Sequence, residues 1–227
     1  MSQEINNKNF KLTLKSEIFP LLIIVIAIII SITTYAQLPD QVVSHWNISG
    51  QPDGWSGKNF HAIVFPGILI FIYLLMSILP KVDPNKQRYT EFAKVYLILR
   101  NILILTFLII FSGATLSNLG YAVNIGSLVS VTIGLLFIIL GNYLGKLKRN
   151  WFIGIRTPWT ISSENSWNKT HRLGGKLFVI LGLIIILIPV LWPQAAFWFL
   201  VGGTTGLIAT VTTYSYIIYR KDKNKLK

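Results

Sequence analysis

The stretch IFPLLIIVIAIIISITTYA, residues 18–36, contains no charged residue and decides the fold class. A helix needs about 20 consecutive apolar residues to cross the hydrocarbon core of a bilayer, which is about 30 Å thick. The strands of a membrane β-barrel would alternate apolar and polar residues instead. The stretch therefore predicts a membrane-spanning helix. A cleaved signal sequence is the alternative for such a run, but its apolar part is only about 7–15 residues long.

Five further apolar segments follow, so we predict an all-α, polytopic bundle of about six membrane-spanning helices in the cell membrane. The chain has 227 residues, of which 52% are hydrophobic and 13% are charged, whereas soluble proteins contain about 25% charged residues. It contains no cysteine, which excludes disulfides and thiolate metal sites. The expected helices cover residues 17–36, 62–80, 95–117, 123–144, 176–193 and 195–219.

The positions of the 21 Lys and Arg residues predict the orientation of the chain. They gather in the N-terminal segment, in the connections after the second and fourth expected helices, and in the C-terminal tail, with Lys58 as the exception. Arg100 lies one turn inside the third helix, from where its side chain can reach the interface. Because cytoplasmic loops carry the excess of basic residues, we expect both termini inside, loop 37–61 outside and loop 145–175 inside.

The net charge of +13 is explained by this topology and by attraction to anionic lipids, so we expect no direct binding of nucleic acid. Small residues four apart let helices approach closely in lipid. Such residues predict packing seams on the sixth helix, at Gly202 and Gly206, and on the fourth, at Gly126, Ser130, Gly134, Gly141 and Gly145.

The outer loop reads QLPDQVVSHWNISGQPDGWSGKNFH, residues 37–61. Its two valines and Trp46 predict a short strand or amphipathic turn at the level of the lipid headgroups. His45, Asp53 and His61 are residue types that bind zinc, but their spacing matches no known motif. We therefore expect no metal and no cofactor, and interpret the loop as a structured cap on the outer face.

The inner loop, residues 145–175, has signals for a short helix. Pro158 disfavours helix at Thr157, and Ser162 or Ser163 suits an N-cap. The pattern predicts a separate interfacial helix over 163–173, which Gly174 and Gly175 would end. Trp167 and His171 would share one face of this helix, four residues apart, with Trp167 among the headgroups and with Lys169 and Arg172 toward anionic lipid.

An acid–base pair of Glu164 and His171 is the one catalytic arrangement that this loop suggests. The two residues are seven apart and have no nucleophile or metal ligand beside them in the sequence. We therefore expect no catalytic residue and no enzymatic activity.

Two motifs resemble those of known proteins. GNYL, Asn150, GIRTPWT and W-x-x-T-H-R-x-x-G, over residues 141–175, resemble the signature of the SdpI family of bacterial membrane immunity proteins. HWN-x-x-G-x-PD, over residues 45–53, resembles a domain family of unknown function that is often fused to SdpI-type regions. The matching residues singled out are Asn142, Asn150, Arg156, Thr157, Pro158, Trp159, Trp167, His171 and Arg172 in the first motif, and His45, Trp46, Asn47 and Asp53 in the second.

The resemblance implies a domain organisation: an N-terminal two-helix region, residues 1–92, and an SdpI-type four-helix region, residues 93–227. It also implies two activities, which are protection of a Gram-positive cell from a secreted sporulation-delaying peptide toxin and capture of a small winged-helix repressor at the membrane. The outer motif residues would then face the toxin, and the inner ones would dock the repressor or simply support the loop. An uncoupled transporter or exporter and a lipid-interacting structural protein are the alternatives. Ion coupling is not expected, because the second, fourth, fifth and sixth helices lack a central ionisable residue.

Overall fold

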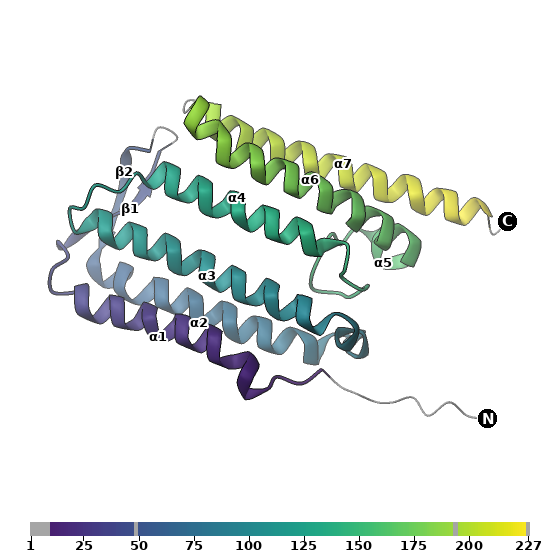
Figure 1. Cartoon of the computed structure of the whole chain (residues 1–227), viewed down its shortest axis with the longest axis horizontal. Helices are drawn as coiled ribbons and strands as arrows, with labels where there is room; N and C mark the ends of the chain where they lie inside the picture. Colours follow the sequence, from purple (N-terminus) through teal and green to yellow (C-terminus); the bar gives the residue numbers. More distant parts are fainter. Residues whose placement is uncertain (1–9, 48–49, 193–194, 226–227) are drawn as a thin grey trace.

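The computed structural model describes residues 10–47, 50–192 and 195–225, and its long helices run alternately between the two ends of an elongated bundle (Figure 1). A small antiparallel β-hairpin is the exception to the all-α prediction. The elements are α1 (Leu14–Thr34), β1 (Gln41–Trp46), β2 (Pro52–Gly57), α2 (Lys58–Val82), the 3-10 helix η1 (Lys86–Phe92), α3 (Ala93–Asn118), α4 (Ile125–Leu144), α5 (Pro158–Ser162), α6 (Glu164–Leu191) and α7 (Ala196–Lys225).

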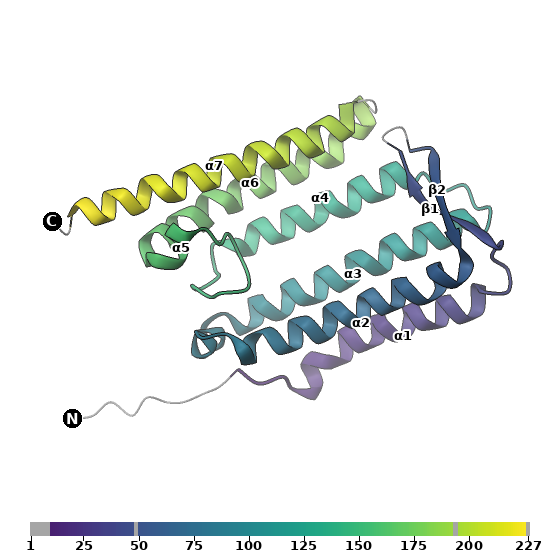
Figure 2. The ribbon, with the colours of Figure 1, turned by 180° about the vertical axis from the view of Figure 1, so that it is seen from behind.

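The two ends of the bundle differ in what they carry (Figures 1 and 2). The hairpin end holds β1 and β2, the connection between α3 and α4, and the turn from α6 to α7. The loop end holds the start of α1, η1, the loop 145–157, α5 and the last turn of α7. Among the described residues, every Lys and Arg except Lys58 lies in the half of the bundle nearer the loop end.

Five of the described helical segments are long and apolar enough to cross a membrane. α7 is not among them, although it is a helix of 30 residues that runs back beside α6. The expected helices are therefore present, and the number of crossings stays a prediction. The five segments are Leu14–Thr34, Lys58–Val82, Lys86–Asn118, Ile125–Leu144 and Glu164–Pro189.

The predicted break at Gly174 and Gly175 is wrong, because α6 continues from Glu164 to Leu191 as one helix. Ser163 is its N-cap and accepts a hydrogen bond from the backbone of Ser166, as one of the two candidates predicted. The glycines lie inside the helix, where a Cβ atom at Gly174 would overlap Ile155 Cδ1 and one at Gly175 would lie 2.6 Å from the carbonyl oxygen of Gly141. Their lack of a side chain serves packing rather than helix termination.

α4 and α6 pack through two glycine–glycine contacts. A Cβ atom at Gly141 would lie 2.5 Å from the carbonyl oxygen of Gly175, and one at Gly134 would lie 2.7 Å from that of Gly182. The predicted seam on the fourth helix is confirmed at these two positions. Among the described residues, Gly202 and Gly206 of α7 have no atom within 4 Å of a built Cβ, so they form no packing seam within the chain, and a seam between chains stays a prediction.

Three apolar clusters fill the bundle. One joins α1, α2 and α3, and another joins α6 and α7. The third lies at the loop end and is shared by both parts of the chain, because η1 and α3 meet α4, the following loop and α6 there. Its buried members are Met76, Tyr89, Phe92, Tyr96, Leu99, Leu144, Leu147 and Trp167.

Contrary to expectation, the Arg100 side chain does not extend to the surface of the bundle. Its side chain is fully buried and donates hydrogen bonds to both carboxylate oxygens of Glu17, at 3.1 and 3.0 Å, and to the carbonyl of Ser16 at 2.8 Å. The hydroxyl of Tyr73 also donates to Glu17, at 2.9 Å. A charge inside a membrane bundle is retained where a partner neutralises it, and Glu17 of α1 provides that partner.

Replacing Gly141 by Ala should lower the unfolding temperature in detergent. The added methyl group meets the backbone of α6, so the helices must separate, at a cost of about 1–3 kcal/mol. Gly206→Ala is the matched control, since its methyl group meets open space and Ala favours helix. Equal unfolding temperatures for the two variants would contradict the assigned α4–α6 contact.

Candidate functional sites at the two ends of the bundle

The hairpin is fixed to the bundle by the last residue of α3. Asn118 accepts a hydrogen bond from the backbone N–H of Val43 at 2.7 Å and donates one to its carbonyl at 3.0 Å. Its amide therefore takes the place of a neighbouring strand along β1. At the base of the hairpin the ammonium group of Lys58 lies 2.8 Å from Asp40 and holds the pKa of that carboxyl below its usual value.

The outer motif residues lie together on this hairpin. His45 Nδ1 and Asp53 Oδ1 are 2.5 Å apart across the two strands. His45 is opposite Gly54 at an irregularity in the strand register, and a Cβ at Gly54 would lie 2.9 Å from that of His45. The segment PDG is thus part of β2, where the glycine makes room for the His45 side chain.

His61 does not join this pair. It is buried against the rings of Phe65 and Phe111, and its Nε2 lies 2.9 Å from the hydroxyl of Thr115. In the described parts of the chain, no group of three His, Cys, Asp or Glu side chains is arranged to hold a metal ion.

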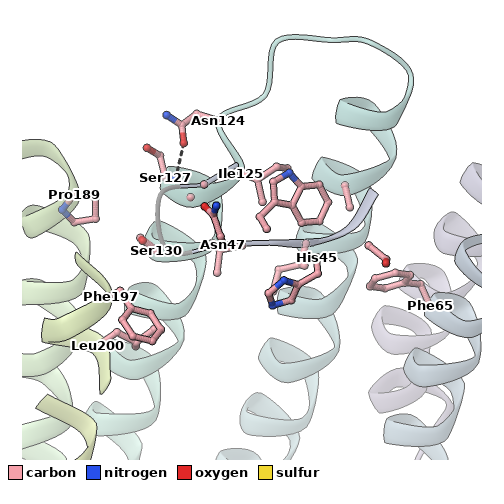
Figure 3. Close-up of a pocket in the computed structure, with 17 residues that line it drawn as sticks. His45, Asn47, Phe65, Asn124, Ile125, Ser127, Ser130, Pro189, Phe197 and Leu200 are labelled. Atoms are coloured by element: carbon pink, nitrogen blue, oxygen red, sulfur yellow. Dashed lines mark hydrogen bonds between the residues drawn. The ribbon is translucent and has the colours of Figure 1, made fainter. Parts of the chain in front are cut away.

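A pocket of about 610 Å³ lies beneath the hairpin, between α2 and α3 on one side and α4, α6 and α7 on the other (Figure 3). Three outer motif residues, His45, Trp46 and Asn47, line the pocket. The fourth, Asp53, pairs with the lining residue His45. The other lining residues are Ser44, Gly50, Phe65, Ile110, Ala114, Asn124, Ile125, Gly126, Ser127, Val129, Ser130, Pro189, Phe197 and Leu200.

At the loop end, Asn150 organises the turn that follows α4. Its side chain is fully buried, accepts from the backbone N–H groups of Phe152 and Ile153 at 2.9 and 2.7 Å, and donates to the carbonyls of Lys148 and Ile153. A buried amide with this many partners is stabilising, whereas an unpaired one would cost about 1–3 kcal/mol. The motif asparagine thus has a structural role in the shape of the loop.

Asp83, between α2 and η1, connects the N-terminal part of the chain to this loop. One oxygen accepts from the hydroxyl of Tyr89 and from the backbone N–H of Trp151, each at 2.9 Å. Arg88 forms a bidentate pair with Glu164, with both N–O distances at 2.7 Å. Sequence reasoning missed Asp83 and Arg88, because no local motif shows which distant residues they meet.

Trp167 and His171 share one face of α6, as predicted, with stacked rings 3.9 Å apart. The expected place of Trp167 among the headgroups is wrong, because the side chain is fully buried and donates to the carbonyl of Leu147 at 2.8 Å. His171 Nε2 accepts from the N–H of Ile155 at 3.0 Å, so Nδ1 carries the proton and donates to the carbonyl of Trp167 at 2.8 Å.

Both His171 nitrogens are therefore occupied. Glu164, the other half of the acid–base pair considered from the sequence, is held by Arg88 and does not contact His171.

The TPWT segment forms the start of α5. Thr157 is extended and caps the helix through a reciprocal hydrogen-bond pair with Thr160, with Pro158 at the first helical position. The Thr157 hydroxyl also lies 2.9 Å from that of Ser215, which ties α5 to α7. The ring of Trp159 packs at 5.0 Å from that of Tyr216.

The remaining motif residues are on the surface. Arg156 donates to the carbonyl of Trp151 at 2.7 Å but its side chain is exposed, as are Pro158 and Arg172. Asn142 is exposed on α4 and donates to the carbonyl of Ile138, one turn before it, at 2.9 Å. The inner motif therefore divides into buried residues that shape the loop and exposed residues on its surface.

These features define an integral, multi-pass membrane protein with a structured site at each end. Residues 146–216 match the model of the SdpI/YfhL protein family, and residues 22–70 match a domain of unknown function, DUF1648. The chain is similar to Immunity protein SdpI of Bacillus subtilis (strain 168), with 27% identity over 208 residues, which cover 92% of this chain and 98% of that protein. No solved structure matches. The resemblance to the SdpI family is confirmed.

Gly154→Ala should destabilise the inner loop. Gly154 has a φ of +112°, which Ala adopts only with strain, and an added methyl group would overlap His171 Nε2, the acceptor for Ile155. We expect faster tryptic cleavage of the detergent-solubilised protein after Arg149 and Arg156.

Gly120→Ala is the control for this prediction, because it shares a positive φ of +89° but has open space around it. It should leave cleavage within the inner loop unchanged. Equal acceleration in both variants would show that the contact with His171 is unimportant.

Proposed function

We propose that this protein is an integral membrane immunity protein that protects the cell from a secreted peptide toxin. The observation that carries the proposal is the similarity to Immunity protein SdpI along 92% of the chain, which includes both polar ends. The outer motif residues His45, Trp46 and Asn47 border a pocket, and Asp53 orients His45. These four residues are the proposed toxin-facing set.

The proposed topology has six crossings with both termini in the cytoplasm. The concentration of basic residues at the loop end supports it, because positive charge is retained on the inner side. The hairpin and pocket then face outward, where a secreted toxin arrives. The proposed division into residues 1–92 and 93–227 is supported by the separate matches to residues 22–70 and 146–216.

The second proposed activity is signalling through a small winged-helix repressor that docks at the loop end. Exposed Asn142, Arg156, Pro158 and Arg172, with partly exposed Trp159, form the proposed contact surface. Asn150, Thr157, Trp167 and His171 are buried and would act by holding that surface in shape. Toxin can shift the protein between two states only if it binds one of them better.

Expression of the protein in a toxin-sensitive Gram-positive strain should increase survival under a sporulation-delaying peptide toxin, compared with empty vector. Membrane amounts are measured by immunoblot. Normal membrane insertion without protection would contradict the immunity role. Flux of small amphipathic compounds through reconstituted liposomes in that case would favour the transporter alternative instead.

Arg156→Ala should abolish recruitment of the repressor to the membrane while protein amount and toxin resistance persist. The side chain makes one hydrogen bond to the loop and is otherwise exposed, so its removal should change stability little. Lys169→Ala removes another exposed positive charge, on α6, and serves as the control. A joint fall in protein amount and resistance in Arg156→Ala would instead assign Arg156 a structural role.

A further inference from the structure

We propose that the hairpin-end pocket binds an apolar segment of the toxin peptide, with the peptide backbone lying along the open edge of β1. This inference rests on the proposed immunity function and adds the place and the mode of binding. It concerns the pocket in Figure 3, between the hairpin and the outer parts of α2, α3, α4, α6 and α7.

The size and lining of the pocket suit apolar side chains. Its volume of about 610 Å³ lies within the range of about 300–1,000 Å³ of ligand pockets, which are mostly apolar with a few placed polar groups. The polar lining groups include Ser44, His45 and Ser127, and His45 is the one titratable side chain among the described lining residues. The apolar lining consists of Phe65, Ile110, Ala114, Ile125, Val129, Pro189, Phe197 and Leu200, with Trp46.

The β1 strand favours a peptide over a lipid chain. β1 pairs with β2 on one edge, and the amide of Asn118 serves its other edge at Val43. Beyond Val43, the next three residues of β1, Ser44, His45 and Trp46, line the pocket, and Figure 3 shows His45 there. A strand edge binds an extended peptide by backbone hydrogen bonds while adjacent pockets take its side chains. An acyl chain has no groups for such bonds.

The surroundings place the pocket at the depth where a membrane-active peptide resides. Large aromatic residues are exposed around the hairpin end, and such residues gather at membrane–water interfaces. A peptide with its apolar side chains in the outer leaflet would meet the pocket at this level. These residues are Trp55, Tyr121, Trp192, Phe197 and Trp198.

A bulky residue inside the pocket tests the proposal first. Ser130 lines the pocket, and its neighbour Val131 does not and is 41% exposed. Ser130→Phe should weaken toxin binding by about tenfold or more, because it takes the space of roughly one apolar side chain. Survival under toxin should fall accordingly at equal membrane amounts, while Val131→Phe should protect like the unaltered protein.

The absence of cysteine from the chain allows a direct measurement of occupancy. Ser127→Cys places a single thiol at the pocket, and Tyr121→Cys places one on the exposed connection at the same end. A membrane-impermeant maleimide applied to intact cells should label both variants. Added toxin should slow the labelling of the Ser127→Cys variant and leave that of the Tyr121→Cys variant unchanged.

Photo-crosslinking identifies the occupant. With p-benzoylphenylalanine in place of Phe197, irradiation in the presence of toxin should give an adduct with the mass of the toxin peptide. A phospholipid adduct alone would overturn the proposal in favour of a lipid site.

The same experiments distinguish a failure of the pocket assignment from a failure of the immunity function. If the unaltered protein protects cells but Ser130→Phe protects equally and toxin leaves the labelling of the Ser127→Cys variant unchanged, the pocket assignment fails and the immunity function stands. If the unaltered protein gives no protection, the immunity function fails and the pocket assignment fails with it.

Discussion

The close contact of α4 with α6 is the constraint on which the rest of the structure depends. Gly134 and Gly141 meet Gly182 and Gly175, so the two backbones approach to a distance that no side chain would allow. In lipid, such contacts replace the hydrophobic drive that packs helices in water. They fix α6 beside α4, and α6 in turn carries Trp167 and His171 into the inner loop, while α7 packs on its other side.

Much of the fold is predictable from the sequence because membrane-spanning helices depend on local composition. Except for the start of α6, each long helix is expected close to its observed place, and the basic residues of the described chain, apart from Lys58, gather at one end. The predictions that fail depend on long-range partners. Gly174 and Gly175 resemble a helix stop until α4 is placed against them, and Arg100 resembles an interfacial residue until Glu17 of another helix is beside it.

In the candidate sites, too, local sequence predicts some features, whereas others depend on long-range partners. The motifs single out most residues of both ends, but sequence alone does not tell which of them face outward. Trp167 is the clearest case, because residue type and helical spacing are the same for an interfacial tryptophan and a buried one. Asn118 and Asp83 carry no motif at all, yet one holds the hairpin and the other holds the inner loop.

The hydrogen bonds of Asn150, Asp83 and His171 give the inner loop a defined shape before any partner arrives. A disordered segment must lose conformational entropy when it binds, whereas a preorganised surface has already lost it during folding. A partner that binds this surface, as proposed, would therefore not have to order the loop on binding. The proposed docking would then be controlled by covering, uncovering or tilting a preformed surface, and α4 and α6 run from that surface to the pocket at the opposite end.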